Sequence, residues 1–597
     1  MNFNTENLDK ETLLHLYKAM VLPRTIEEKM LIALRQGKIS KWFSSWGQEA
    51  TSVGSALAMN KEEYILTMHR NLGVFTSREI PLDRLFSQFQ GKMNGFTKGR
   101  DRSFHFGTQE FKIVGMISHL GSQMGVADGI ALSHLLNQEE KCTLVYTGDG
   151  GASEGDFHEA VNTAAVWNLP VIIVVENNQW GLSTPSREQF RCKSFADKGI
   201  GYGIEAHSIN GNNILEVYQT FKNLAESIRK NPRPILVECN TFRLRGHEEA
   251  SGTAYYPEGM IEEWTKQDPI ANYEQFLLSE GILTQNLIEE IKESYKKQVD
   301  DALDQTIAEP EIIPNKKTEL EDVYAPFDNQ EILPQKLQNR EIRFIDAISE
   351  AIEISMKNHP NLVLMGQDIA EYGGAFKITE GFVEKFGKKR VRNTPLCEAA
   401  IVGSGLGLSI NGYKSMVEMQ FADFVTEGFN QIINNLAKTH YRWNQNADVV
   451  VRMPTGAGTG AGPFHSQSNE AWFTKTPGLK IAYPAFPDDA KGLLIQSFED
   501  PNPVLFFEHK KLYRSLKGNV PEGFYTTPFG KARKVKEGDE LTIITYGLGV
   551  HIALEFAEKN PEISLEIVDL RTLIPLDTET IYESVKKCNK VIILHDF

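Results

Sequence analysis

The stretch GDGGASEGDFHEAVNTAAVWNLPVIIVVENNQWGLSTP, residues 148–185, decides the fold. Apolar runs at 142–146 and 171–175 are typical of buried strands, and the segment between them, 154–167, has the apolar spacing of a helix. A strand, a helix and a strand in this order form a unit whose two strands are parallel neighbours. The sequence therefore predicts an α/β fold built on a parallel sheet.

Polar residues stand where both predicted strands end. Asp149 follows the first strand and Asn178 the second, and the carboxyl ends of parallel strands share the edge at which ligands bind. A carboxylate and an amide oxygen suit Mg²⁺, which completes its coordination shell with phosphate oxygens and water. Gly148 and Gly150 let the backbone approach a phosphate. Two ordinary turns are the alternative, since Gly-Asp-Gly and Asn-Asn are common turn sequences.

Length and composition limit the class of protein. The 597 residues suffice for about three or four domains. A hydrophobic content of 41% and a charged content of 24% are those of a globular protein. The net charge of −16 disfavours nucleic-acid and anionic-membrane partners, and the longest apolar runs fall far short of the ~20 residues of a membrane span. Five scattered cysteines and an N-terminus without targeting features predict a cytoplasmic protein.

The rest of the chain shows further organisation. Apolar spacing at 13–34, interrupted by Pro23, predicts two opening helices. The segment 307–339 has four prolines and little periodicity, which predicts a linker. A third α/β unit begins near Thr527, and the chain stops at Phe597 straight after a predicted strand, so we expect the last domain to be incomplete. Between and beyond these points we expect strands at 362–365, 416–420, 448–453, 541–546, 565–570 and 590–594 and helices at 399–409 and 425–441.

One glycine motif imitates a nucleotide site. GSGLGL at 403–408, with Glu418 beyond it, resembles the fingerprint of a nicotinamide enzyme. That loop must follow a strand directly, whereas 398–402 is predicted as the first turn of the same helix, so close helix packing explains the glycines better. The Gly-rich run 456–462 lacks the Lys-Ser/Thr of an ATP-binding P-loop.

The pattern GDG followed about thirty residues later by NN resembles the thiamine-diphosphate binding motif, and the whole chain resembles the E1 component of a 2-oxo acid dehydrogenase complex with its α and β subunits fused. Motifs of the second half stand in the family's order: TPLCEAAIVGSGLGLS (394–409), VEMQFADF (417–424), GAGTGAGPFHSQS (456–468), PGLKIAYPAFPDDAKGLL (477–494) and DLRTLIPLD (569–577). The resemblance implies an α/β fold with two thiamine-diphosphate-binding parallel-sheet domains and a truncated transketolase C-terminal-like domain. The implied boundaries are 1–308 for the diphosphate-binding domain, 309–339 for the linker, 340–526 for the pyrimidine-binding domain and 527–597 for the last domain.

The resemblance also implies roles for single residues. Asp149, Asn178 and the main-chain carbonyl of Trp180 match the Mg²⁺ ligands. The remaining matches are Arg70 and the glycines Gly148 and Gly150 at the diphosphate, Ser118 and Leu120 with their backbone at the aminopyrimidine, Glu398 at the pyrimidine N1′, Phe424 on that ring, and His247 and His465 as the two active-site histidines. In the implied chemistry the cofactor accepts the electrons left by decarboxylation. Glu398 acts as a general acid/base through the cofactor. The two histidines, able to titrate near neutral pH, orient the substrate carboxylate and deliver a proton when the acyl group leaves for lipoamide.

Two local departures from the family's pattern affect the site. β subunits commonly have GED where this chain has Gly366, Gln367 and Asp368, which removes one carboxylate near the expected cofactor. After His247, a Glu-Glu-Ala-Ser-Gly segment replaces a serine with two aspartates in a loop that kinases modify. We therefore do not expect control by phosphorylation at Ser251.

The implied function is oxidative decarboxylation of a 2-oxo acid, with transfer of the acyl group to lipoamide on a lipoyl-bearing E2 acyltransferase. SEGDFHEA and QFADF favour branched-chain substrates such as 3-methyl-2-oxobutanoate, with pyruvate or acetoin dehydrogenase E1 as the alternative. A transketolase or a deoxyxylulose-phosphate synthase is a less favoured alternative, because it would need basic residues for a sugar phosphate and the HSQS motif and the linker pattern do not suggest them. A non-catalytic scaffold is disfavoured because Asp149, Asn178, Glu398 and His465 are all present. Fusion of α and β would turn an α₂β₂ tetramer into a homodimer.

Overall fold

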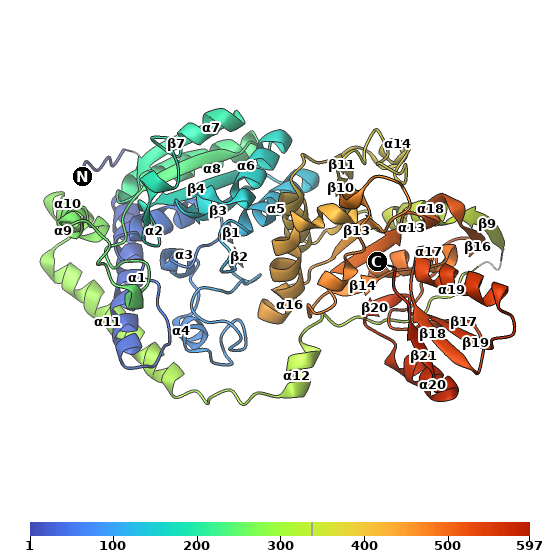
Figure 1. Cartoon of the computed structure of the whole chain (residues 1–597). Helices are drawn as coiled ribbons and strands as arrows, with labels where there is room; N and C mark the ends of the chain where they lie inside the picture. Colours follow the sequence, from blue (N-terminus) through green and yellow to red (C-terminus); the bar gives the residue numbers. More distant parts are fainter. Residues whose placement is uncertain (7, 336–337, 597) are drawn as a thin grey trace. The chain divides into compact units, whose positions relative to one another are not determined.

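The computed structural model describes residues 1–6, 8–335 and 338–596 and shows two compact units, Met1–Lys316 and Lys317–Phe597 (Figure 1). Both units are layered α/β structures with largely parallel sheets, as predicted. In the described part of the chain, no helix is both long enough and apolar enough to cross a bilayer.

The first unit is built on a six-stranded sheet with the order β2-β1-β3-β4-β8-β7, in which all neighbours are parallel. The predicted strand-helix-strand unit is confirmed: α6 (Gly155–Trp167) connects β3 to β4, and Gly148 pairs with Glu176. The apolar run of β4 is buried on both faces, as is typical of a central parallel strand. The strands are β1 (Ile65–Leu66), β2 (Ile113–Val114), β3 (Thr143–Gly148), β4 (Val171–Asn177), β7 (Glu205–Asn210) and β8 (Ile235–Asn240), and a small hairpin joins β5 (Trp180–Gly181) to β6 (Thr184–Pro185).

The N-terminal helix α1 (Lys10–Arg35) continues through Pro23, so the prediction of two opening helices was wrong. Met20 and Met30, on either side of the proline, are fully buried, and this packing outweighs the ~3 kcal/mol that an interior proline costs. Helix α11 packs along α1 (Figure 1). The other helices of this unit are α2 (Glu49–Ala58), α3 (Leu72–Ser77), α4 (Leu82–Gln90), α5 (Gln123–Asn137), α7 (Asp197–Tyr202), α8 (Ile214–Lys230), α9 (Met260–Thr265), α10 (Pro269–Ser279) and α11 (Gln285–Ile307).

The segment predicted as a linker contains local structure. It includes the short helix α12 (Lys316–Glu321). Beyond that helix, Tyr324 Oη donates a hydrogen bond to the Leu479 carbonyl at 3.0 Å, and Asn329 Nδ2 donates to the Phe529 carbonyl at 2.7 Å. The last part of the segment is therefore anchored on the second unit, which the low apolar periodicity of its sequence did not indicate.

The second unit contains a seven-stranded sheet with the order β11-β10-β12-β13-β15-β14-β20, antiparallel only between β14 and β20, and a four-stranded sheet with the order β17-β19-β18-β21. The six predicted strands are present, with ends within two residues of the predicted ones. The strands are β9 (Asn339–Arg343), β10 (Leu362–Gly366), β11 (Val391–Asn393), β12 (Lys414–Glu418), β13 (Val449–Thr455), β14 (Lys480–Ala482), β15 (Val504–His509), β16 (Lys517–Pro521), β17 (Arg533–Lys536), β18 (Leu541–Thr545), β19 (Leu565–Asp569), β20 (Thr572–Ile574) and β21 (Val591–Ile593).

The GSGLGL motif lies inside helix α15 (Glu398–Ile410), which confirms that it is no nucleotide loop. A Cβ atom on Gly405 would lie 3.0 Å from Ser415 Oγ and 3.2 Å from Val449 Cγ1, so the glycine allows the helix to pack closely on β12 and β13. The helix predicted at 425–441 is present from 429 to 443, with a π-helical turn (Gln431–Leu436) before α16 (Ala437–Trp443), and a separate 3₁₀ turn (Ala422–Thr426) precedes it. The other helices of this unit are α13 (Phe344–Asn358), α14 (Phe382–Phe386), α17 (Pro487–Glu499), α18 (Leu512–Ser515), α19 (Leu548–Lys559) and α20 (Thr578–Cys588).

Candidate active site

The predicted site residues of the first unit lie at one edge of its sheet. They lie at or after the ends of five parallel strands, β2, β1, β3, β4 and β8, which are consecutive neighbours in the sheet. Carboxyl ends of such strands form the usual ligand-binding edge of an α/β sheet. In that strand order the residues are Ser118 and Leu120, then Arg70, then Asp149 with its flanking Gly148 and Gly150, then Asn178, and finally His247.

Asp149 and Asn178 occupy adjacent strand ends and are both buried. Asp149 is only 1% exposed, its Oδ2 accepts a hydrogen bond from Ser186 Oγ, and burial raises the pKa of its carboxyl group. Asn178 Oδ1 accepts a hydrogen bond from the Trp180 N–H at 3.2 Å, which holds the Trp180 backbone beside the amide. The neighbouring Asn177 instead donates to Glu238 on β8 at 2.7 Å.

Arg70 is a buried cation without a carboxylate partner. It is 5% exposed, and its guanidinium donates to the Ser44 carbonyl at 2.7 Å and to the His247 carbonyl at 2.9 Å. None of the ion pairs among the described residues includes it. Burial, followed by repulsion from Arg243, lowers its pKa to about 10. Arginine does not deprotonate near neutral pH, so this buried group keeps its positive charge and is suited to bind an anion.

Arg243 is a second buried guanidinium that the sequence analysis missed. Only 1% of it is exposed. It donates from Nη1 to His247 Nδ1 at 3.0 Å and from Nη2 to the Leu182 carbonyl, while its Nε has no hydrogen-bond partner among the described residues. Its charge acts on Asp149 by lowering the pKa of that carboxyl group, although burial has the larger and opposite effect. The sequence signal was a second basic residue in the FRLRGH segment after β8, but nothing in that segment indicates burial.

The environment of His247 differs from the expected one. Burial, Arg70 and Arg243 together lower its pKa to about 3, so this histidine is neutral at pH 7 rather than titrating near neutrality. Its backbone N–H donates to Tyr255 Oη at 3.0 Å, and its ring packs on that of Phe43 with centroids 5.5 Å apart. A neutral imidazole between two guanidiniums would gain a proton more easily once an anion bound there.

Ser118 and Leu120 occupy the loop after β2. Ser118 is exposed, with its Oγ 3.3 Å from His105 Nε2, and Leu120 is half-buried at the margin of the first unit's core. Both follow the carboxyl end of β2, and the contact of their backbone with a ligand stays a prediction.

The predicted site residues of the second unit are likewise at strand ends. Glu398 opens α15 after β11, and its Oε1 accepts a hydrogen bond from Gln367 Nε2, beyond β10, at 2.9 Å. Phe424 follows β12 and His465 follows β13, and their ring centroids are 5.4 Å apart. The structure therefore brings Phe424 and His465 together and gives Glu398 a neutral partner, Gln367.

Lys510, directly after β15, is a buried cation at the same edge that the sequence analysis also missed. It is 4% exposed, and its Nζ has no hydrogen-bond partner within the described ranges. Burial lowers its pKa to about 8. It lies 5.5 Å from the ring centroid of Phe421, whose ring in turn packs 4.7 Å from that of His465.

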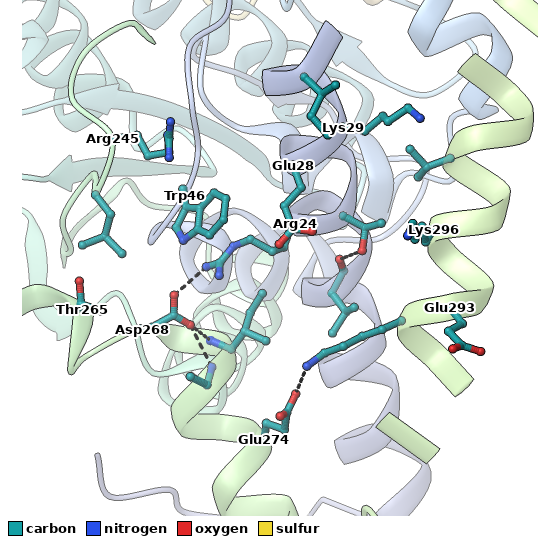
Figure 2. Close-up of a pocket in the computed structure, with 18 of the residues that line it drawn as sticks. Arg24, Glu28, Lys29, Trp46, Arg245, Thr265, Asp268, Glu274, Glu293 and Lys296 are labelled. Atoms are coloured by element: carbon teal, nitrogen blue, oxygen red, sulfur yellow. Dashed lines mark hydrogen bonds and ion pairs between the residues drawn. The ribbon is translucent and has the colours of Figure 1, made fainter. Parts of the chain in front are cut away.

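A cavity of about 790 Å³ in the first unit lies between α1, α10 and α11, away from these groups (Figure 2). Several of its charged side chains pair with each other, among them Arg24 with Asp268 at 2.9 Å and Lys292 with Glu274 at 2.8 Å. The unpaired guanidiniums are instead at the strand ends. Among residues 1–6, 8–335 and 338–596, no group of three or more His, Cys, Asp or Glu side chains is arranged to hold a metal; the predicted Mg²⁺ set contains one carboxylate.

Comparison with known proteins covers almost the whole chain. A family described as "Dehydrogenase E1 component" matches residues 17–315. The chain belongs to this family. Two further families match the second half, "Transketolase, pyrimidine binding domain" over 340–515 and "Transketolase, C-terminal domain" over 530–597.

The second half is similar to β subunits of E1 enzymes. It is 48% identical over 255 residues to the 2-oxoisovalerate dehydrogenase subunit beta of Bacillus subtilis, which covers 42% of this chain and 78% of that protein. Identity to the mitochondrial 2-oxoisovalerate dehydrogenase subunit beta of Dictyostelium discoideum is 43% over 265 residues, covering 43% and 71%. Identity to the pyruvate dehydrogenase E1 component subunit beta of Bacillus subtilis is 41% over 262 residues, covering 43% and 80%.

The chain thus joins an α-like and a β-like half of a 2-oxo acid dehydrogenase E1 component in one polypeptide, as the sequence motifs predicted. E1 components of this family depend on thiamine diphosphate. The buried residues fit that cofactor, because the positive charges of Arg70 and Arg243 suit a diphosphate and neither guanidinium has a carboxylate within ion-pair distance among the described residues.

Proposed function

We propose that this E1 component catalyses oxidative decarboxylation of a 2-oxo acid and passes the acyl group to lipoamide on a lipoyl-bearing E2 acyltransferase. The observation that carries the proposal is the pair of buried guanidiniums of Arg70 and Arg243. They flank His247 without a carboxylate partner, at the strand-end edge that also holds Asp149. Buried charges are normally paired, so an anion is the missing partner.

Asp149, Asn178 and the carbonyl of Trp180 would hold Mg²⁺ beside the diphosphate. Asp149 is buried and hydrogen-bonded to a single hydroxyl, that of Ser186. Mg²⁺ is usually bound by one or two carboxylates together with substrate phosphates and water, so one aspartate is a sufficient protein charge. A Cβ atom on Gly148 would meet nothing within 4 Å, so the backbone is accessible there, whereas a Cβ atom on Gly150 would lie 3.1 Å from Gly181 Cα.

The second unit would hold the other end of the cofactor. When bound, thiamine diphosphate supplies an electron sink for the carbanion that decarboxylation leaves. Glu398 would exchange a proton with the aminopyrimidine N1′, and Phe424 would pack on that ring. His465 of this unit and His247 of the first unit would orient the substrate and deliver a proton, and Ser118 and Leu120 of the first unit would present their backbone to the aminopyrimidine.

We further propose the domain limits 1–308 for the diphosphate-binding domain, 309–339 for the linker, 340–526 for the pyrimidine-binding domain and 527–597 for the last domain.

For the substrate we propose a branched-chain 2-oxo acid such as 3-methyl-2-oxobutanoate. Support comes from the sequence of the second half, which is 48% identical to a subunit named for 2-oxoisovalerate and 41% identical to one named for pyruvate, both from the same organism. The difference is modest, and a pocket discriminates by only ~1–3 kcal/mol per methylene. Pyruvate is therefore the comparison substrate in any assay.

We also propose that the chain forms a homodimer, the fused equivalent of α₂β₂. Mixing an Asp149→Ala chain with a Glu398→Gln chain tests how the sites are shared. If each site combines the halves of two chains, mixed dimers regain one intact site and part of the activity. If each chain completes its own site, activity does not return. A monodisperse, fully active monomer in light scattering would contradict the dimer.

The direct test of function is a dye-reduction assay with thiamine diphosphate, Mg²⁺ and a panel of branched-chain 2-oxo acids, pyruvate and 2-oxobutanoate. We expect turnover that requires both the cofactor and the metal, and the highest kcat/KM with a branched-chain acid. A second stage replaces the dye with a lipoylated E2 domain and measures acyl transfer. Turnover of none of the 2-oxo acids by the cofactor-saturated protein would contradict the proposal.

A further inference from the structure

We propose that Gln367 is a positioning residue that holds the Glu398 carboxylate in one orientation through a hydrogen bond from its neutral amide. This inference rests on the proposed role of Glu398 and adds to it a residue to which the sequence analysis assigned no role. It also gives a function to the glutamine that stands where a carboxylate is usual in β subunits.

The two residues are held by rigid elements. Gln367 is 7% exposed and directly follows β10, while Glu398 is the first residue of α15, a few residues after β11. β10 and β11 are parallel neighbours, with Gly366 opposite Asn393. The distance of 2.9 Å between Gln367 Nε2 and Glu398 Oε1 is that of a good hydrogen bond. One carboxylate oxygen is thus fixed, and the half-buried side chain keeps its second oxygen for another partner.

The charges on the elements packed against α15 are paired with each other. Arg452 on β13 pairs with Glu418 on β12, and Lys414 pairs with Asp448 at 2.8 Å. The π-helical turn Gln431–Leu436, which also packs on α15, carries no charged residue. Asp368, next to Gln367, accepts a hydrogen bond from Gln420 at 3.1 Å.

The Gln367 amide is neutral, and this matters for the protonation of the Glu398 carboxylate that it contacts. Two carboxyl groups in contact share one proton, because both cannot ionise at that distance without strong repulsion, and the pKa of one of them rises. An amide at position 367 orients Glu398 without competing for a proton. Gln367→Glu would create such a carboxyl pair, whereas Gln367→Ala would remove the orienting bond and add no charge.

The test compares Gln367→Glu and Gln367→Ala with wild type, and with Gln298→Glu as a control that adds the same charge on the exposed face of α11. The first readout is infrared titration of ¹³C-glutamate-labelled protein prepared without cofactor. The Glu398 band is identified in each background by its loss in Glu398→Gln. The second readout is the affinity for thiamine diphosphate by calorimetry, and the third is the pH profile of kcat and of kcat/KM.

We expect Gln367→Glu to raise the titration midpoint of Glu398 by about one pH unit or more and to move the acid limb of the kcat profile in the same direction. We expect Gln367→Ala to lower kcat about tenfold, since a hydrogen bond to a charged group is lost, while KM and cofactor affinity change less than about twofold. Gln298→Glu should match wild type throughout.

A Glu398 titration and a kcat profile that superimpose on wild type in Gln367→Glu would overturn the positioning role. Equal losses of cofactor affinity and kcat in Gln367→Ala would also overturn it, because they would indicate a general structural defect. Failure of wild type to turn over any 2-oxo acid would instead contradict the proposed function, and the infrared titration would still report on the pair.

Discussion

Replacing Arg70 by methionine should make the cofactor-free protein more stable and the cofactor bind more weakly. The pKa of Arg70 falls from its usual 12.5 to about 10, chiefly through burial, and one pH unit corresponds to about 1.4 kcal/mol. Keeping this cation buried therefore costs about 3 kcal/mol in the absence of an anion.

The substitution also has an unfavourable part. It leaves the carbonyls of Ser44 and His247 without the donors that they have now, which costs about 1–2 kcal/mol. The net expectation is a gain of about 1–2 kcal/mol in the free energy of unfolding. For thiamine diphosphate, loss of a charge-assisted contact predicts a Kd about 100-fold higher.

The assay is urea unfolding of cofactor-free protein, followed by far-ultraviolet circular dichroism, with calorimetric titration of thiamine diphosphate in parallel. Arg84→Met is the control, since that arginine pairs with Glu110 on an exposed surface and should change neither quantity by more than about 0.5 kcal/mol. A cofactor-free Arg70→Met protein that is less stable than wild type, with an unchanged Kd, would refute the view of Arg70 as a charge held for an anion.

Two further predictions concern the stability of the two units. The folded-state pKa of His247, about 3, lies below its ordinary 6.5. As the pH drops from about 6.5 towards 3, the unfolded chain therefore binds a proton at this histidine that the folded chain does not, and the stability of the fold falls. His247→Gln should reduce this acid destabilisation in melting curves, and an unchanged pH dependence would contradict the reasoning. Gly478 has φ +97°, and a Cβ atom there would lie 1.8 Å from the Ala437 carbonyl oxygen, so Gly478→Ala should destabilise the second unit by more than about 3 kcal/mol. Gly412 has φ +86° but open space around it, so Gly412→Ala should cost only about 1 kcal/mol. Equal melting temperatures for the two variants would count against this reasoning.

Local sequence was sufficient where periodicity and strand ends carry the information. The run VIIVV, followed by Glu176 and two asparagines, placed β4 and its carboxyl end, because a strand buried on both faces is apolar at almost every position. The same reasoning placed the glycines of 403–408 inside α15. It failed at Pro23, where packing of the helix on both sides of the proline outweighs a local penalty that sequence rules treat as decisive.

The parts of the site that depend on tertiary contacts were not predictable. Arg243 and Lys510 are ordinary basic residues in sequence, and only the fold shows that their charged groups are buried without a carboxylate within bonding distance. Gln367 was noted as a missing carboxylate, yet its bond to Glu398 joins residues 31 positions apart. The pKa of His247 likewise depends on two guanidiniums contributed by the ends of β1 and β8.

The most direct test of the central claim separates binding from chemistry in two variants, with calorimetry for thiamine diphosphate and NMR for exchange of its C2 proton. Asp149→Ala should lose Mg²⁺-dependent binding while keeping the wild-type circular dichroism spectrum. Glu398→Gln should bind the cofactor with a Kd within about threefold of wild type and exchange the C2 proton at least about 100-fold more slowly. Undiminished Mg²⁺-dependent binding in Asp149→Ala, or C2 exchange at the wild-type rate in Glu398→Gln, would contradict the account of how this chain holds and activates its cofactor.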